Sequence, residues 1–180
     1  MNSFMGQGRV TKILIGINLL VFLAQLTSGG NVTSLLALQP SLVFWEPWTI
    51  ITSGFAHADW LHLLLNMYSL WIFGEAIESY IGAKRFLWLY LLSIVGGSLA
   101  FIFFEGGGSW VVGASGGVFG LMGAYFIIIR AMGFRSSQML VLIGINVFLG
   151  FTNPGVAISA HIGGLIAGAG IAWYFTMRKR

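Results

Sequence analysis

The sequence predicts an all-α membrane protein, built as a bundle of six transmembrane helices with a long external loop between helices 1 and 2. Three observations support this fold class. Hydrophobic residues make up 57% of the 180-residue chain and charged residues 8%, far from the composition of soluble domains. Six apolar stretches approach the length needed to cross a bilayer, and they are continuous rather than alternating as in strands. Within lipid, only helices and closed barrels satisfy their own backbone hydrogen bonds, so continuous runs favour helices.

We expect the six helices to follow one another in a single domain that covers residues 1–180. The first apolar run follows a short polar start without a convincing small-residue cleavage site, so it is expected to stay in the membrane rather than be removed as a signal peptide. The fifth run is the shortest of the six. The predicted spans are 11–27, 59–78, 85–104, 114–131, 137–151 and 156–177, with ends accurate to about 3 residues.

The positive side chains predict the orientation of the bundle. With a cytoplasmic amino terminus, all nine lysine and arginine residues fall in or beside cytoplasmic segments, while Glu46, Asp59 and Glu105 fall in external ones. Positive residues gather on the cytoplasmic side of membrane proteins, so both termini of this multi-pass chain are expected in the cytoplasm. The short loops and the absence of cysteine favour a plasma (cell inner) membrane. The nine residues are Arg9, Lys12, Lys84, Arg85, Arg130, Arg135, Arg178, Lys179 and Arg180.

The external loop over residues 28–58 is long for a connection, so we expect it to be functional or partly structured. Its segment "SLVFWEPW" carries Phe44, Trp45 and Trp48, and such aromatic residues are typical of the headgroup region of a membrane. Two interpretations remain open: the loop anchors the fold at the interface, or it contacts a substrate.

Five polar side chains interrupt the apolar runs at one level. His57, His62 and Asn66 lie at the start of the second span, Ser115 at the start of the fourth, and His161 early in the sixth. These three spans all run from outside to inside, so their first turns are expected at the same depth. At 1.5 Å per residue, the deepest of these residues lie roughly 10 Å below the outer surface. The pattern predicts a polar cluster within the outer half of the membrane.

Simpler interpretations of each residue also remain open. A lone intramembrane serine often bonds the backbone of its own helix, and a lone histidine often bridges two helices. The glycines in "GASGG" and "HIGGLIAGAG" indicate close packing between helices. That packing would itself bring Ser115 towards His161. The spaced pairs are Gly113 with Gly117, Gly116 with Gly120, and Gly164 with Gly168.

Ser115 and His161 together fit nucleophilic catalysis. A serine hydroxyl is a weak nucleophile until an adjacent base takes its proton, and neutral imidazole is the usual base. The acidic residues lie near the membrane surfaces, too far to orient the base. We therefore predict a Ser–His dyad whose imidazole packs against Phe119, one helical turn after Ser115.

Acyl transfer also needs donors for the negative charge that develops on the carbonyl oxygen. His62 and Asn66 are four residues apart and share a helical face. Asp59 is placed to cap that helix. The backbone N–H of Ser115, in the first turn of its helix, completes a predicted oxyanion hole. His57 falls on a different side and is expected in the loop, with a structural bond.

Three motifs give the chain a resemblance to the rhomboid intramembrane serine proteases over nearly its whole length, about residues 10–177. They are "HADWLHLLLNM" from His57, "GASGG" around Ser115 and "AHIGGLIAG" around His161, in the family's order and on the matching spans. The family's six-helix core agrees with the six predicted spans.

The resemblance assigns roles to individual residues. It implies Ser115 as nucleophile and His161 as general base, with His62 and Asn66 in the oxyanion hole. Phe119 stands where some members of the family have tyrosine, so it keeps the ring but not the hydroxyl. The remaining supporting residues are Gly113 and Gly116 beside the nucleophile and Glu78, which resembles a structural glutamate.

The function expected from the residues and the resemblance is an intramembrane serine endopeptidase. It would cleave single-span membrane proteins near the outer face of the bilayer through an acyl-enzyme on Ser115, with water reaching it from a polar cavity under the 28–58 loop. No cofactor and no metal are expected: His57 and His62 are five apart, which is wrong for one helical face, and no cysteine completes a zinc site. The expected partners are substrate helices and membrane lipid. A nucleic-acid partner is not expected, because the positive residues lie beside hydrophobic runs instead of on one basic face.

Two other classes of protein fit the sequence less well. A non-catalytic rhomboid relative that binds membrane helices would lack the serine or the base, and both are present. A channel or transporter would need polar residues through the full depth of the membrane. Here they stop halfway, which favours an enzyme.

Overall fold

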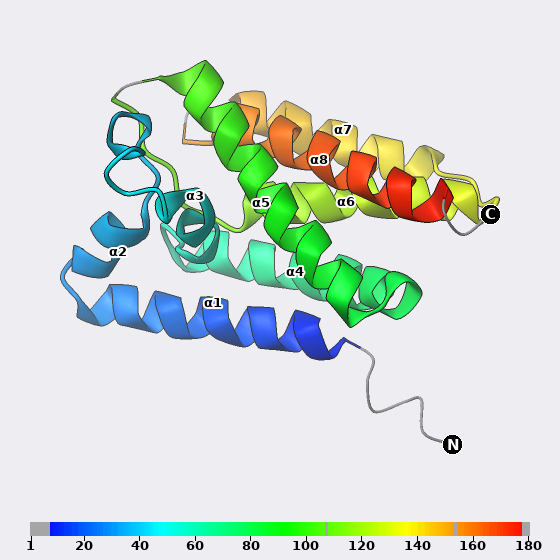
Figure 1. Cartoon of the computed structure of the whole chain (residues 1–180), viewed down its shortest axis with the longest axis horizontal. Helices are drawn as coiled ribbons and strands as arrows, with labels where there is room; N and C mark the ends of the chain where they lie inside the picture. The colour runs from blue at the N-terminus through cyan, green and yellow to red at the C-terminus, as the bar shows by residue number, and fades with distance from the viewer. Residues whose placement is uncertain (1–7, 107, 153–154, 178–180) are drawn as a thin grey trace.

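The computed structural model describes residues 8–106, 108–152 and 155–177, and these residues form a helical bundle. No strand occurs in this part of the chain, although Leu38 and Val111 form one isolated bridge. All six predicted spans are helices with ends within three residues of those expected, which confirms the predicted fold class (Figure 1). They are α1 (Arg9–Thr27), α4 (Trp60–Ile81), α5 (Ala83–Glu105), α6 (Ser115–Ala131), α7 (Ser137–Thr152) and α8 (Ile158–Met177).

The surface of the bundle is suited to lipid. Helices α1, α5 and α8 are long and apolar enough to cross a membrane, and α6 and α7 are apolar but shorter, with 17 and 16 residues. Large apolar side chains point outward along the helices, and exposing such a surface to water would be unfavourable. The protein is therefore a multi-pass membrane protein. Examples of these outward side chains are Leu20, Leu61, Phe148 and Ile166.

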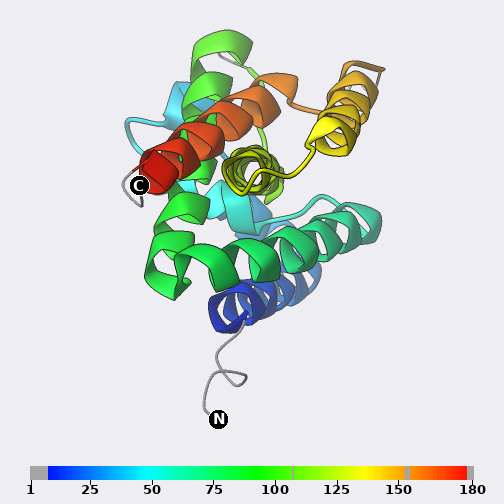
Figure 2. The ribbon, with the colours of Figure 1, turned by 90° about the vertical axis from the view of Figure 1, so that its right-hand side faces the viewer.

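Helix α6 forms the centre of the bundle. Figure 2 shows it nearly end-on, with α4, α5 and α8 around it. Residues 116–124 are all buried, which covers more than two turns and therefore every face of the helix. A helix enclosed on all sides is apolar all round, as this segment is. The first turn of α6, with Ser115, is thus held by the core of the molecule.

Glycine contacts bring α6 and α8 together as predicted. A Cβ atom on Gly164 would collide with the carbonyl oxygen of Gly116, and one on Gly168 would collide with that of Gly120. The two backbones therefore touch along this seam, so even alanine would force them apart. Gly117 differs from the expectation: it packs against α5, where its Cβ would lie 2.7 Å from the Tyr90 ring.

The connections differ in length. Helices α4 and α5 are joined by Gly82 alone, which has a φ of 85° that favours glycine, so the connection between the predicted spans 59–78 and 85–104 is one residue long. The 28–58 loop is partly structured, as expected, and gathers at one end of the bundle (Figure 1). Phe44 and Trp45 are 92% and 80% exposed there, as an interfacial position requires. The loop contains α2 (Asn31–Leu36), η1 (Pro40–Leu42), α3 (Thr49–Thr52) and η2 (Ser53–Phe55).

Glu78 ties the far end of α4 to the start of α1. Its buried carboxylate accepts hydrogen bonds from the backbone N–H groups of Val10 and Thr11, each at 2.9 Å, and from the Thr11 hydroxyl at 2.8 Å. The first N–H groups of a helix have no partner within it, so Glu78 supplies the cap from another helix. The terminal Arg178, Lys179 and Arg180 lie outside the described residues.

Candidate active site

Helices α4, α6 and α8 begin towards the same end of the bundle, as predicted for three spans that run in the same direction (Figure 1). Ser115 is the first residue of α6 and is half-buried. The first backbone bond within that helix runs from the Val118 N–H to the Ala114 carbonyl at 2.9 Å. The N–H groups of residues 115–117 therefore precede the helical ladder and point outward from its start. One of them belongs to Ser115, as expected for an oxyanion donor.

Gly113 shapes the space in front of Ser115. Its φ is 138°, a conformation that other residues rarely adopt, and its N–H donates to the Ser53 carbonyl at 2.9 Å. A Cβ atom at Gly113 would lie 2.8 Å from His62 Nε2 and 3.5 Å from Ser115 Oγ. The His62 ring and the Ser115 hydroxyl thus face the same small space, which only a glycine leaves open.

The His62 ring is held by its surroundings. Asp59 caps α4 by accepting the His62 N–H at 2.8 Å, which confirms the predicted cap. His62 Nδ1 accepts a long hydrogen bond of 3.5 Å from the Ala58 N–H. A neutral imidazole that accepts at Nδ1 carries its proton on Nε2. Nε2 is the nitrogen beside Gly113, so the ring presents a donor to the site.

Asn66 lies one turn below His62 and is buried. Its side-chain amide donates to the His62 carbonyl at 2.9 Å. That bond uses one of its two N–H groups and leaves the second as a donor. His62 and Asn66 share a face, as their spacing predicts.

His161 lies in the first turn of α8 and is half-buried. Its ring stacks on Phe119, with centroids 4.2 Å apart and planes 13° from parallel, which confirms the predicted packing. Its Nδ1 atom is buried and has no hydrogen-bond partner among the described residues. Nε2 is therefore the nitrogen that remains to exchange a proton.

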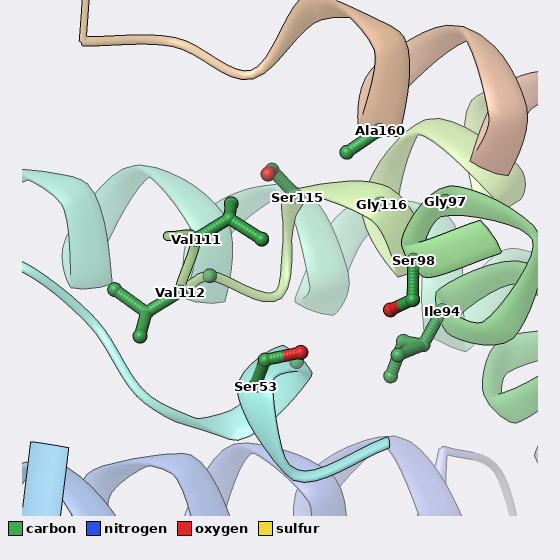
Figure 3. A pocket seen from close by; sticks show the side chains of 11 residues that line it. Ser53, Ile94, Gly97, Ser98, Val111, Val112, Ser115, Gly116 and Ala160 are labelled. Atoms are coloured by element: carbon green, nitrogen blue, oxygen red, sulfur yellow. The ribbon is translucent and has the colours of Figure 1, made fainter. Parts of the chain in front are cut away.

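Ser115 and His161 lie in the same layer but are not bonded to each other. Phe119, which carries the His161 ring, is one turn after Ser115 on α6. Ala160, which precedes His161, lines the same hollow as Ser115 (Figure 3). Within the described part of the chain, the Ser115 hydroxyl bonds neither to His161 nor to its own helix. The alternative interpretation, in which the Ser115 hydroxyl bonds the backbone of its own helix, is therefore not supported.

The hollow beside Ser115 has a volume of about 20 Å³, enough for about one water molecule. Figure 3 shows the hydroxyls of Ser53 and Ser98 entering it from opposite sides, while that of Ser115 points away from them. Ser98 donates to the Ile50 carbonyl at 2.7 Å. The hollow lies beside the end of the 28–58 loop, where a polar cavity was expected. Neither Ser53 nor Ser98 was predicted as a site residue, although Ser98 interrupts an apolar run.

His57 lies in the loop before α4, as predicted. It is 1% exposed, and its ring meets the His62 ring edge-on at 5.2 Å. Burial, reinforced by the nearby His62, lowers the pKa of His57 to about 3. The ring stays neutral at ordinary pH. Its structural bonds are made by the backbone: the His57 N–H donates to Gln25, and the His57 carbonyl accepts from Gln25.

Known proteins and a known protein family are similar to this chain. Residues 44–178 match the family described as Rhomboid domain. The chain is 34% identical over 174 residues to "Rhomboid protease GluP" of Bacillus subtilis (strain 168), covering 91% of this chain and 34% of that protein. It is 32% identical over 139 residues to "Putative rhomboid protease YdcA" of the same organism, covering 74% of this chain and 70% of that protein.

A plant relative is similar to the same degree. The chain is 36% identical over 143 residues to "RHOMBOID-like protein 6, mitochondrial" of Arabidopsis thaliana, covering 75% of this chain and 46% of that protein. The chain thus spans about a third of the length of GluP and under half of the plant protein, but most of YdcA. Since the match to the Rhomboid domain covers most of this chain, the chain belongs to the rhomboid family.

Proposed function

We propose that residues 1–180 form one intramembrane serine protease domain that hydrolyses peptide bonds in other membrane proteins. The observation that carries this proposal is the meeting of three helices around Ser115. His62 of α4 faces the space in front of the Ser115 hydroxyl, and His161 of α8 stacks one turn away on Phe119. Two of the similar proteins are named as rhomboid proteases, which supports the same activity.

The reaction would proceed through an acyl-enzyme. The Ser115 hydroxyl attacks the peptide carbonyl carbon, and its proton moves to His161 Nε2. The C–N bond then breaks, and His161 gives this proton to the leaving amine. In the second half, a water molecule attacks the ester carbon, His161 takes a proton from the water, and that proton returns to Ser115 as the C–O bond breaks.

Three donors would hold the oxyanion. His62 supplies Nε2–H, Asn66 its second amide N–H, and Ser115 its backbone N–H. Such preorganised donors stabilise the developing charge without rearranging during the reaction, and removing one costs about 10²- to 10³-fold in rate.

The missing hydrogen bond between Ser115 and His161 is compatible with this mechanism. In enzymes without substrate, catalytic hydrogen bonds are often long and tighten only when substrate binds. A rotation of the Ser115 side chain about its own Cα–Cβ bond redirects the hydroxyl without moving either helix. The stacked Phe119 ring keeps the His161 imidazole in place meanwhile.

We propose single-span membrane proteins as substrates, cut near the outer face of a plasma membrane, with both termini of this chain cytoplasmic. The small hollow beside Ser115 favours small side chains at the cleavage point. A helical substrate has its amide groups bonded internally, so it must unwind before attack, and glycine near the cut would ease this.

The test is cleavage of a tagged single-span reporter by purified enzyme in liposomes. Ser115→Ala and His161→Ala should each abolish cleavage while leaving the protein inserted and folded. Ser79→Ala is the matched serine control, because the Ser79 hydroxyl donates to the Ala76 carbonyl at 2.8 Å, near the other end of α4, and cleavage should persist. Full cleavage by Ser115→Ala would remove it from the mechanism and favour a non-catalytic, helix-binding role.

A further inference from the structure

Gln25 is a buried amide in the last turn of α1, and its hydrogen bonds reach a segment more than thirty residues away. Its Nε2 donates to the His57 carbonyl at 3.0 Å and to the Thr33 hydroxyl at 2.9 Å. Its Oε1 accepts the His57 N–H at 2.9 Å. Both N–H groups are thus used, and the amide binds both the carbonyl and the N–H of His57. An amide without such partners would be costly to bury.

The bond from Gln25 to the His57 carbonyl affects the same peptide group whose N–H binds His62. The His57 carbonyl and the Ala58 N–H belong to one planar peptide group, and no cis peptide bond occurs in the described chain. Fixing the direction of the carbonyl therefore fixes the direction of the N–H on the opposite side. Gln25 holds the carbonyl, and the Ala58 N–H donates to His62 Nδ1.

The bond at Nδ1 has a chemical consequence at Nε2. A neutral imidazole carries one proton, and a donor facing Nδ1 keeps that proton on Nε2. Nε2 lies 2.8 Å from the position that a Gly113 side chain would occupy, next to Ser115. The Asp59 cap fixes the His62 backbone but not its ring, so the Ala58 N–H is the hydrogen-bond contact that selects the ring's tautomer.

We propose that Gln25 is a positioning residue for the oxyanion hole. It acts through the His57–Ala58 peptide to keep the His62 proton on Nε2, where it faces the reacting carbonyl oxygen. The inference rests on the proposed function, because it assigns His62 a role in that reaction. Through Gln25, helix α1 would contribute to catalysis, whereas its other contacts are structural.

The first test compares Gln25→Met with Thr33→Val in the liposome cleavage assay. Methionine keeps the length and volume of the side chain but cannot hold the His57 peptide. Its kcat should fall ~10-fold with KM unchanged, part of the 10²- to 10³-fold loss for removing a donor outright. Thr33→Val removes only the third hydrogen bond of Gln25 and should keep the wild-type kcat. Equal losses in both variants would mean that Gln25 merely joins α1 to α2, and would overturn the proposal.

The second test observes the tautomer directly. The chain has only three histidines, so ¹⁵N-imidazole NMR in detergent gives few signals, assigned with His57→Gln and His161→Ala. In the wild type, the His62 signals should be those of an Nε2–H ring with an acceptor Nδ1. In Gln25→Met they should shift towards a mixture of tautomers. Wild-type His62 signals in that variant would refute the proposal, whatever its activity.

A second variant, with a shorter side chain, keeps the proposal testable if Gln25→Met does not fold. Gln25→Asn keeps a polar amide in the buried position but cannot span both groups of His57, so it should show the same change in kcat and tautomer. Ser115→Ala in the same assay separates the two proposals. If Ser115→Ala remains active, the proposed function fails. If it is inactive while both Gln25 variants keep the wild-type kcat and His62 signals, only the role of Gln25 fails.

Discussion

The rings of Phe119 and His161 stack almost parallel, with centroids 4.2 Å apart. This contact fixes one face of the imidazole while leaving its edge free. Nδ1 of His161 is buried without a partner in the described chain, so no carboxylate orients the imidazole that we propose as the base, as an aspartate does in a catalytic triad. The orientation of the base therefore comes from ring packing and from the glycine seam that holds α8 against α6.

Replacing the ring of Phe119 should therefore slow the reaction. Phe119→Leu keeps an apolar side chain but loses the flat surface, so kcat should fall ~10- to 10²-fold because the imidazole is no longer held in line. Phe119→Tyr keeps the ring and should retain most of the activity. The measurement is kcat in liposomes, together with the rate at which a serine-directed phosphonate labels Ser115. An unchanged labelling rate in Phe119→Leu would contradict the role of the stack.

Gly113→Ala should inactivate the enzyme. The added methyl would lie 2.8 Å from His62 Nε2, and the φ of 138° would be strained by about 1–3 kcal/mol. We expect a loss of more than ~10²-fold in kcat because His62, the proposed oxyanion donor, is displaced. Gly133→Ala is a matched control, since Gly133 also has a positive φ, of 82°, but open space around it. It should lose about 1 kcal/mol of stability and keep its activity; similar inactivation of both would show that strain alone is responsible.

The fold could be predicted because its determinants are local. Each span is a continuous apolar run, and the charges at its ends fix its direction. The Asp59 cap follows in the same way from spacing along one helix. The Phe119 stack joins α6 to α8, and its prediction used only the place of Phe119 one turn after Ser115. Gly82 illustrates the limit: the sequence predicts a loop there, but only the backbone shows that one glycine with positive φ reverses the chain.

The parts of the site that escaped prediction depend on contacts between distant segments. Gln25 lies inside an apolar run, and its polarity alone does not reveal that its partner is His57, 32 residues later. Ser53 contributes its carbonyl to Gly113 only because the loop folds back over α6. The rotamer of Ser115 depends on packing between distant segments, which a sequence pattern does not encode.

His57 should make the protein sensitive to acid. Its pKa is about 3 in the folded state against 6.5 for an ordinary histidine. Between these pH values the unfolded chain therefore binds a proton that the folded chain does not bind. The contribution of the neutral ring is fully present above pH 6.5 and is lost as pH falls from 6.5 to about 3. The loss amounts to about 1.4 kcal/mol per pH unit.

The measurement is the free energy of unfolding between pH 7 and pH 4 for the wild type and His57→Gln. Glutamine cannot take up a proton, so the variant should lose less stability over this interval. The titratable groups that act on His57, His62 and Asp59, are common to both proteins and cancel in the comparison. Parallel pH profiles would show that His57 is not the group that senses acid.

Glu78 should contribute far more to stability than Glu75, its neighbour one turn earlier on α4. Glu78→Ala leaves three donors at the start of α1, two of them buried, without their acceptor, and should lower the free energy of unfolding by roughly 2–4 kcal/mol. Glu75 makes an exposed ion pair with Lys12 at 3.4 Å, so Glu75→Ala should cost less than about 1 kcal/mol. Unfolding by a denaturing detergent would measure both. Since neither carboxylate lies near Ser115, the folded fraction of each variant should keep the wild-type kcat, and equal destabilisation would show that the cap at α1 is not formed in the membrane.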